Sequence, residues 1–248
     1  MFQEVKRMSF FAANNLVKQF GGLTAVANLN FTVNQGEIFG IIGPNGSGKT
    51  TVFNLISRFF PLTSGEIYFK GKRIDTLPAH KICQVGIGRT FQVVKPLKRM
   101  SVLDNVMAGA FLRTSQVGKA RAKAKEIVHF CGLEPYKDFE AKSLPIPLRK
   151  RLEIARALAT EPELLLLDET CAGLNPKESE EAILLIRKIR EAGVTIIIVE
   201  HLMKVMMGIS DRILAINFGG QITTGAPKEV AGHPEVIKAY LGDAYAQG

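Results

Sequence analysis

The stretch "GPNGSGKT", from Gly43 to Thr50, decides how this chain folds. It matches the pattern G-x-x-x-x-G-K-[ST] and lies between an apolar segment, residues 37–42, and a helical pattern that begins at Thr50. Its glycines let backbone N–H groups approach an anion closely, and the start of the following helix favours negative charge. Lys49 is expected to reach the β- and γ-phosphates of a nucleotide, and the Thr50 hydroxyl to bind Mg²⁺. The residues expected to hold the phosphates are Gly43, Pro44, Asn45, Gly46, Ser47, Gly48, Lys49, Thr50 and Thr51.

Two acids follow an apolar run further along the chain. "LLLLDE", residues 164–169, predicts a buried strand that ends in Asp168 and Glu169. Asp168 is expected to reach the metal beside Thr50, and Glu169 to orient or deprotonate a water that attacks the γ-phosphate. The apolar run "VTIIIVE" ends just before His201. A histidine at a strand end is often structural, but this one leaves the same sheet edge as the phosphate loop, which favours a functional role.

Strands of leucine and β-branched residues alternate with helical patterns, which indicates an α/β fold with a mostly parallel sheet. With the glycine-rich loop, this predicts a P-loop NTPase core of the RecA-like type. Alternation over about residues 9–33 predicts an N-terminal antiparallel β-subdomain, and "GEIYFKGKRI" predicts a hairpin turning at residues 70–72. We expect one domain over 1–248. The nucleotide-binding core with the β-subdomain covers about 1–100 and 151–230, an inserted α-helical subdomain about 101–150, and a C-terminal tail 231–248.

Composition sets limits on the class of protein. The 248 residues are 46% hydrophobic and 22% charged, as in a globular protein, and the net charge is +9. No apolar run approaches the ~18 residues of a membrane span, and we expect no signal peptide. The basic residues are not interleaved with aromatic ones as in a base-stacking surface, so no nucleic-acid partner is expected. The charge fits solvated faces, an anionic membrane surface or a phosphate-rich ligand, and does not decide between them.

Taken in order, these motifs resemble the ATP-binding subunit of an ABC transporter over nearly the whole length. The segments that carry the resemblance are "GPNGSGKTT", "GRTFQ", "RLEIARALATEPELLLLDE", "AGLNP" and "VEH". The resemblance implies binding of ATP and Mg²⁺, with Phe20 stacking on adenine. Gln92 matches the glutamine that meets Mg²⁺ and the attacking water and that senses the membrane subunits. Glu169 matches the catalytic glutamate, and His201 the histidine near the γ-phosphate.

One segment departs from the family pattern. Where the family carries Leu-Ser-Gly-Gly-Gln, whose amides hold the γ-phosphate in the opposite subunit, this chain has Leu144, Pro145, Ile146, Pro147 and Leu148. Two prolines remove two amide donors, and Ile146 adds a Cβ where close approach is needed. We place residues 149–151, all basic, in the first turn of the next helix. Their charge either replaces part of the lost contact or faces only solvent or an acidic partner.

Asn175 is a second departure, because the family has aspartate at that place in the loop after the glutamate. An amide can still donate and accept across a dimer interface, but it carries no charge. The poor signature favours a heterodimer with a second ATPase over a homodimer.

Within the family, the likeness is to the ATPases of branched-chain amino-acid importers, through "GIGRTFQ", "LRKRLEIARALAT", "DETCAGLNP" and "HPEVIKAYLG". This implies that the chain is attached peripherally to the cytoplasmic face of the cell membrane, beneath transmembrane permease subunits. It also implies indirect cooperation with a solute-binding protein. The alternatives are an ABC ATPase of lipid or lipopolysaccharide export, whose members keep the glycine signature, and a non-transport ABC ATPase.

Overall fold

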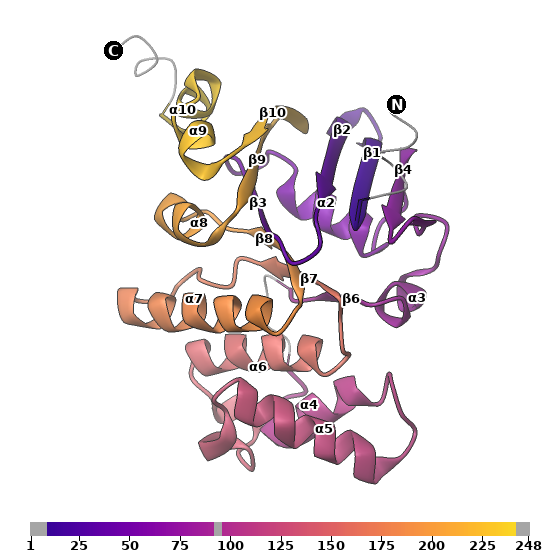
Figure 1. Ribbon diagram of the computed structural model, residues 1–248, viewed down its shortest axis with the longest axis vertical. Helices are drawn as coiled ribbons and strands as arrows, with labels where there is room; N and C mark the ends of the chain where they lie inside the picture. Colours follow the sequence, from indigo (N-terminus) through magenta and orange to yellow (C-terminus); the bar gives the residue numbers. More distant parts are fainter. Residues whose placement is uncertain (1–8, 92–95, 242–248) are drawn as a thin grey trace. The chain divides into compact units, whose positions relative to one another are not determined.

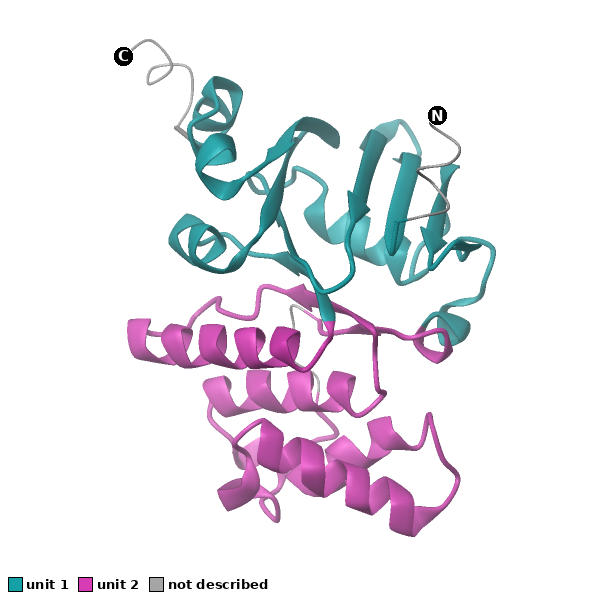
Figure 2. Cartoon of the chain, viewed as in Figure 1, with its two compact units in different colours: residues 1–82, 195–248 teal, residues 83–194 magenta. Residues whose placement is uncertain are grey.

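The computed structural model describes residues 9–91 and 96–241. The chain forms two compact units, residues 1–82 with 195–248 and residues 83–194 (Figure 2). Unit 1 is therefore made of two pieces of chain that are far apart in the sequence. The boundary between the units falls within α3 (Ala79–Gln84). Among the described residues, no helix is both long enough and apolar enough to cross a bilayer.

An antiparallel sheet lies in the N-terminal part of unit 1, as the alternation of residues 9–33 predicts (Figure 1). Its strands, in spatial order, are β2 (Leu23–Val33), β1 (Phe11–Phe20), β4 (Ser64–Phe69) and β5 (Lys72–Arg73). β1 pairs with both neighbours, so that Phe11 is opposite Val33 on one side and Phe69 on the other. This confirms the predicted antiparallel β-subdomain.

The hairpin between β4 and β5 turns at Lys70 and Gly71, which confirms the prediction from "GEIYFKGKRI". Both residues have positive φ, 52° and 73°. Two left-handed residues in succession match the twist of the flanking strands, and glycine adopts this conformation without strain.

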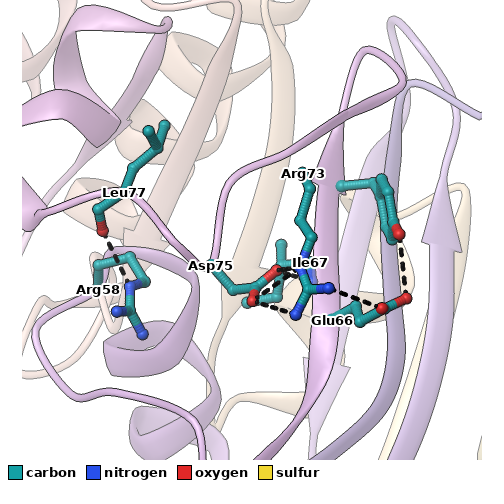
Figure 3. Close-up of polar contacts among 7 residues, drawn as sticks. Arg58, Glu66, Ile67, Arg73, Asp75 and Leu77 are labelled. Atoms are coloured by element: carbon teal, nitrogen blue, oxygen red, sulfur yellow. Dashed lines mark hydrogen bonds and ion pairs between the residues drawn. The ribbon is translucent and has the colours of Figure 1, made fainter.

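Charged side chains fasten this hairpin (Figure 3). The Asp75 carboxylate accepts hydrogen bonds from the amide of Ile67, at 2.9 Å, and from the guanidinium of Arg73, which also donates to Glu66 at 2.8 Å. Burial by itself raises the pKa of Asp75, but the bonds from Arg73 and Ile67 outweigh it and lower the pKa below its ordinary value. The arrangement is a structural clamp within the β-subdomain.

The strand before the glycine-rich loop lies between two parallel neighbours in unit 1. The elements of this part are β3 (Ile38–Ile42), α2 (Lys49–Ile56), β8 (Thr195–Val199), α8 (Met203–Ile209), β9 (Arg212–Asn217), β10 (Gly220–Gly225), α9 (Pro227–Ala231) and α10 (Pro234–Leu241). β3 pairs in parallel with β8 and β9, and β10 is antiparallel to β9. Every residue of β3 and β8 is buried, as in strands covered on both faces. The Phe31 and Phe39 rings stack with centroids 5.5 Å apart and join the antiparallel sheet to β3.

The dipeptide Gly219-Gly220, which follows the apolar run "RILAINF", predicts a turn at the two glycines. In the structure Gly220 begins β10, and the turn after β9 consists of Phe218 and Gly219. Phe218 has a φ of 46° and an 86% exposed side chain. A bulky residue in this region of φ is uncommon, and the sequence gives no sign of it.

Unit 2 contains a parallel strand pair and most of the long helices. Its elements after α3 are β6 (Ile87–Arg89), α4 (Val102–Ala110), α5 (Val117–Phe130), the 3₁₀ turns η1 (Glu134–Tyr136) and η2 (Ala141–Ser143), α6 (Ile146–Leu158), β7 (Leu164–Asp168) and α7 (Pro176–Glu191). β6 pairs in parallel with β7. α5 stops before Gly132, which has a φ of 67°, as the sequence "CGLEP" predicts. α4, α5 and the start of α6 lie between residues 101 and 150.

α6 begins earlier than expected. Pro145 is its N-cap and Pro147 lies in its first turn, where the missing amide proton costs little. Arg149 is therefore the fourth helical residue, and the placement of residues 149–151 in the first turn is wrong. The two prolines begin the helix instead of preceding it.

Candidate functional site

The glycine-rich loop joins β3 to α2 in unit 1, as predicted, and two of its glycines have different tasks. Gly48 is the N-cap of α2 with a φ of 107°, and a Cβ there would lie 2.5 Å from the carbonyl oxygen of Ala25. Gly46 has a φ of 80°, and a Cβ there would meet no atom within 4 Å. One glycine thus packs the loop against its neighbours, whereas the other leaves open space beside the backbone. An anion can approach the loop on that open side.

The lysine of the loop binds the backbone of two other loop residues. Lys49 Nζ donates to the carbonyl oxygens of Gly43, at 2.8 Å, and Pro44, at 2.9 Å, and only 5% of the residue is exposed. Thr50, in the first turn of α2, is exposed, and Thr51 beside it is half-buried. A cation, a helix N-terminus and exposed hydroxyl groups are the groups that bind polyphosphate.

The C-terminal helix contacts the start of this loop, which sequence reasoning missed. The amide of Gly43 donates to the hydroxyl oxygen of Tyr240 in α10, at 2.8 Å, and burial raises the pKa of that phenol. A cavity of about 550 Å³ lies beside the loop. It is lined by Pro44, Asn45, Gly46, Ser47, Asn217, Phe218, Glu235, Lys238 and Ala239. Because the two segments are almost two hundred residues apart, no local sequence signal predicts this contact.

The predicted adenine-stacking residue stands at the end of β1. Phe20 is 41% exposed, packs edge-on against Phe60 with ring centroids 5.2 Å apart, and has Lys18 Nζ 4.8 Å from its centroid. Phe60 was not predicted. A half-exposed ring held on one side by a second ring can stack on a base with its other face.

His201 follows β8, with one residue between the strand and the histidine. β3 and β8 are parallel neighbours, and Ile41 of β3 is opposite Val199 of β8. Because β3 runs directly into the glycine-rich loop, His201 leaves the same edge of the sheet as the loop, as expected. The side chain is exposed.

The predicted acids lie in unit 2, at the end of β7. Asp168 is 2% exposed and forms an ion pair with Arg89, whose NH2 lies 3.2 Å from the carboxylate. Burial lowers the pKa of Arg89, and the charge of Asp168 opposes that shift. The amide of Asp168 donates to the Thr90 hydroxyl at 3.1 Å. These contacts fix the carboxylate that is expected to approach the metal.

Glu169 has an unusual backbone. Its φ is 51° and it is 7% exposed. A left-handed conformation costs a non-glycine residue about 1–3 kcal/mol, so neighbouring contacts must maintain it. Lys150 Nζ donates to the Glu169 carbonyl oxygen at 2.7 Å. Such a charge-assisted bond typically contributes about 1.5–3 kcal/mol, enough to offset the strain.

Sequence reasoning also missed a half-buried acid in α6. Glu153 accepts a hydrogen bond of 3.0 Å from the amide of Phe91, and burial raises the pKa of its carboxyl group to about 7. Phe91 immediately precedes Gln92, and Gln92 itself lies outside the described residues. Glu153 therefore binds the backbone of the residue directly before Gln92, the predicted metal-binding glutamine.

The basic residues after the prolines bind groups of the same chain. Arg149 donates to the carbonyl oxygens of Leu144, at 2.6 Å, and Lys142, at 2.8 Å. Arg151 pairs with Glu181 at 2.9 Å. Ile146 is 59% exposed at the helix start. The alternative that these bases face only solvent or a partner is wrong, because each holds a group of its own unit.

Asn175 acts as a helix cap, which was not predicted. Its side-chain oxygen accepts from the amide of Glu178 at 2.9 Å, and the Glu178 carboxylate accepts from the amide of Asn175 at 2.9 Å. This capping box begins α7. The pattern N-x-x-E before an apolar run could have revealed it.

Comparisons with known proteins agree with this geometry. Residues 26–172 match the ABC transporter family, and residues 221–246 match the family "Branched-chain amino acid ATP-binding cassette transporter". The chain is 40% identical over 249 residues to the high-affinity branched-chain amino acid transport ATP-binding protein LivG of Salmonella typhimurium, covering 94% of this chain and 98% of that one. It is 34% identical over 239 residues to the lipopolysaccharide export system ATP-binding protein LptB of Escherichia coli, covering 96% and 99%.

Solved structures show the same fold. A nucleotide-free ATP-binding cassette from an ABC transporter superposes with a TM-score of 0.87 at 30% identity, covering 95% of this chain and all of that one. The dimeric structure of MJ0796, a bacterial ABC transporter cassette, superposes with a TM-score of 0.80 at 26% identity, covering 88% and 98%. With a family match over more than half its length, the chain belongs to the ABC transporter family as an ATP-binding cassette, an ATPase.

Proposed function

We propose that this ATPase powers the import of branched-chain amino acids. The observation that carries the proposal is the glycine-rich loop held by α10, because α10 lies in the C-terminal segment that matches the branched-chain family. The identity to LivG over nearly the whole chain supports the same substrate class. The higher identity to LivG than to LptB favours amino-acid import over lipopolysaccharide export.

The chain's own residues divide the work of hydrolysis. Residues 43–51 bind the triphosphate, and Phe20 stacks on the adenine. Glu169 holds the attacking water and takes its proton, and His201 donates to the γ-phosphate as it leaves. The strained, buried backbone of Glu169 supports this role, because such conformations concentrate at functional sites.

The donor set fits Mg²⁺. The proposed ligands are Thr50, Gln92 and Asp168, which offer the hydroxyl, amide and carboxylate oxygens that a hard cation prefers. Asp168 is buried and oriented by Arg89, as a metal-directed carboxylate is. When bound, the ion would neutralise part of the negative charge on the phosphates.

The proposed assembly has this chain on the cytoplasmic face of the membrane, beneath two permease subunits. A second ATPase with an intact glycine signature is its partner in a heterodimer, and a solute-binding protein delivers the amino acid. The dimeric cassette of known structure supports pairing, and the two prolines support a non-identical partner. We propose that residues 1–248 form a single cassette domain.

The test combines purification with transport. The chain is tagged and purified gently from its native membranes, its partners are identified by mass spectrometry, and uptake of radiolabelled leucine is measured in cells carrying wild type or Lys49→Ala. Two permeases, a second cassette and loss of uptake in the variant are expected. Recovery with lipopolysaccharide-transport components, or unchanged leucine uptake in the variant, would contradict the proposal.

A further inference from the structure

The lysine just after the modified signature contacts the candidate catalytic acid. Lys150 is the fifth residue of α6, and its Nζ lies 2.7 Å from the carbonyl oxygen of Glu169. Both residues belong to unit 2, nineteen positions apart. The contact therefore joins α6 to the loop that follows β7.

The carbonyl that Lys150 holds belongs to Glu169 itself. Glu169 has a left-handed backbone, and its carbonyl also accepts from the amide of Ala172 at 3.3 Å in a tight turn. The preceding residue is fixed independently, because Asp168 contacts Arg89 and Thr90. With one side of Glu169 anchored by β7, the hydrogen bonds to its carbonyl hold the other side of its backbone.

We propose that Lys150 is a positioning residue for Glu169, an inference that rests on the proposed catalytic role of that glutamate. The ammonium group holds the Glu169 carbonyl and so maintains a backbone conformation that an acidic residue adopts poorly by itself. Without it, the peptide after Glu169 relaxes toward the ordinary regions of φ, and the carboxylate leaves the position from which it orients water. The segment next to the prolines thus acts on the acid of its own chain.

The test is Lys150→Met in the full chain, purified with its membrane partners. We expect kcat for ATP hydrolysis to fall about tenfold while KM for ATP changes less than about twofold, because the lysine acts on the water-activating group and not on nucleotide binding. Lys150→Arg, which keeps a cationic donor, restores most of kcat.

A matched control comes from the same unit. Lys188 Nζ donates to the carbonyl oxygen of Phe130 at 3.0 Å, so Lys188→Met removes the same kind of bond elsewhere. Its kcat is expected to equal that of wild type. Normal kcat in Lys150→Met, an equal loss in Lys188→Met, or failure of arginine to restore activity would each overturn the proposal.

Two further measurements separate this inference from the proposed function. Near-normal turnover in Glu169→Gln would show that Glu169 is not catalytic. Low turnover in Glu169→Gln together with normal turnover in Lys150→Met would exclude only the positioning role of Lys150. Hydrogen exchange supplies a readout independent of activity: the amides of residues 170–172 exchange faster in Lys150→Met and not in Lys188→Met. If Lys150→Met fails to fold, Lys150→Gln is measured instead, with the same outcomes deciding.

Discussion

The amide of Gly43 donates a 2.8 Å hydrogen bond to the hydroxyl oxygen of Tyr240. Gly43 begins the phosphate loop, and Tyr240 lies in α10, within the segment that matches the branched-chain family. A Cβ at Gly43 would collide with the carbonyl oxygen of Ile216 and with the Ser47 hydroxyl, so the residue is also packed tightly by β9 and the loop. The first residue of the loop is thus held from three directions.

Replacement of Tyr240 by phenylalanine removes only the hydroxyl group. The Gly43 amide then lacks this acceptor, a change of about 0.5–1.5 kcal/mol, and we expect nucleotide affinity to weaken about twofold to tenfold. Titration with a fluorescent ATP analogue measures it. The control is Tyr136→Phe, in η1 of the other unit, which should leave affinity unchanged. Equal affinity in Tyr240→Phe and wild type would show that α10 does not support the loop.

Gly48→Ala tests the packing of the phosphate loop. The new methyl group would lie 2.5 Å from the Ala25 carbonyl in a left-handed backbone, so we expect ATP binding to be lost and stability to fall by about 1–3 kcal/mol. Gly118→Ala is the control, because a Cβ at that position in α5 meets nothing within 4 Å and alanine favours a helix by about 0.5–1 kcal/mol. Calorimetry measures both variants, and ATP binding that survives in Gly48→Ala contradicts the account.

Glu153 predicts a pH dependence of stability. Burial raises the pKa of Glu153 from its ordinary 4.5 to about 7, with the nearby Arg156 and Lys150 opposing the shift. The folded protein therefore holds this proton more tightly than the unfolded chain, so stability declines as pH rises from about 4.5 to 7 and stays lower above it. Glu153→Gln cannot ionise. We expect it to exceed wild type by about 1–3 kcal/mol at pH 8 and to match it near pH 4. Thermal unfolding across pH decides, and parallel curves for the two proteins refute the shift.

The two prolines at the start of α6 predict an asymmetric dimer. Pro145 and Pro147 have no amide proton, so this segment donates poorly to a phosphate. With Glu169→Gln to slow turnover, we expect the chain alone to remain monomeric with ATP, and to dimerise with a second cassette that carries an intact glycine signature. Light scattering after gel filtration measures the mass. ATP-dependent homodimers of the Glu169→Gln chain alone would exclude this asymmetry.

The parts of the structure that follow local rules could be predicted from sequence. The glycine-rich loop between β3 and α2, the turn at Lys70 and Gly71, and the end of α5 before Gly132 each depend on residues within a few positions of one another. The phosphate-binding half of the site therefore follows from short patterns of spacing and of glycine.

The contacts that refine the site could not be predicted. Lys150 reaches a carbonyl nineteen residues away, and Tyr240 reaches an amide 197 residues away. Side chains that bind backbone groups leave no periodic pattern, because every residue offers a carbonyl and nearly every residue an amide. Asn175 is different, because its capping box with Glu178 is a local pattern, N-x-x-E, that the sequence displays.

The bond between Gly43 and Tyr240 also has a consequence for synthesis on the ribosome. Its two partners are separated by 197 residues, which at about 5–20 residues per second take roughly 10–40 s to translate. Unit 1 stays incomplete throughout this interval, because its second piece begins only at residue 195. The nascent loop thus emerges long before the helix whose hydroxyl group binds its first residue.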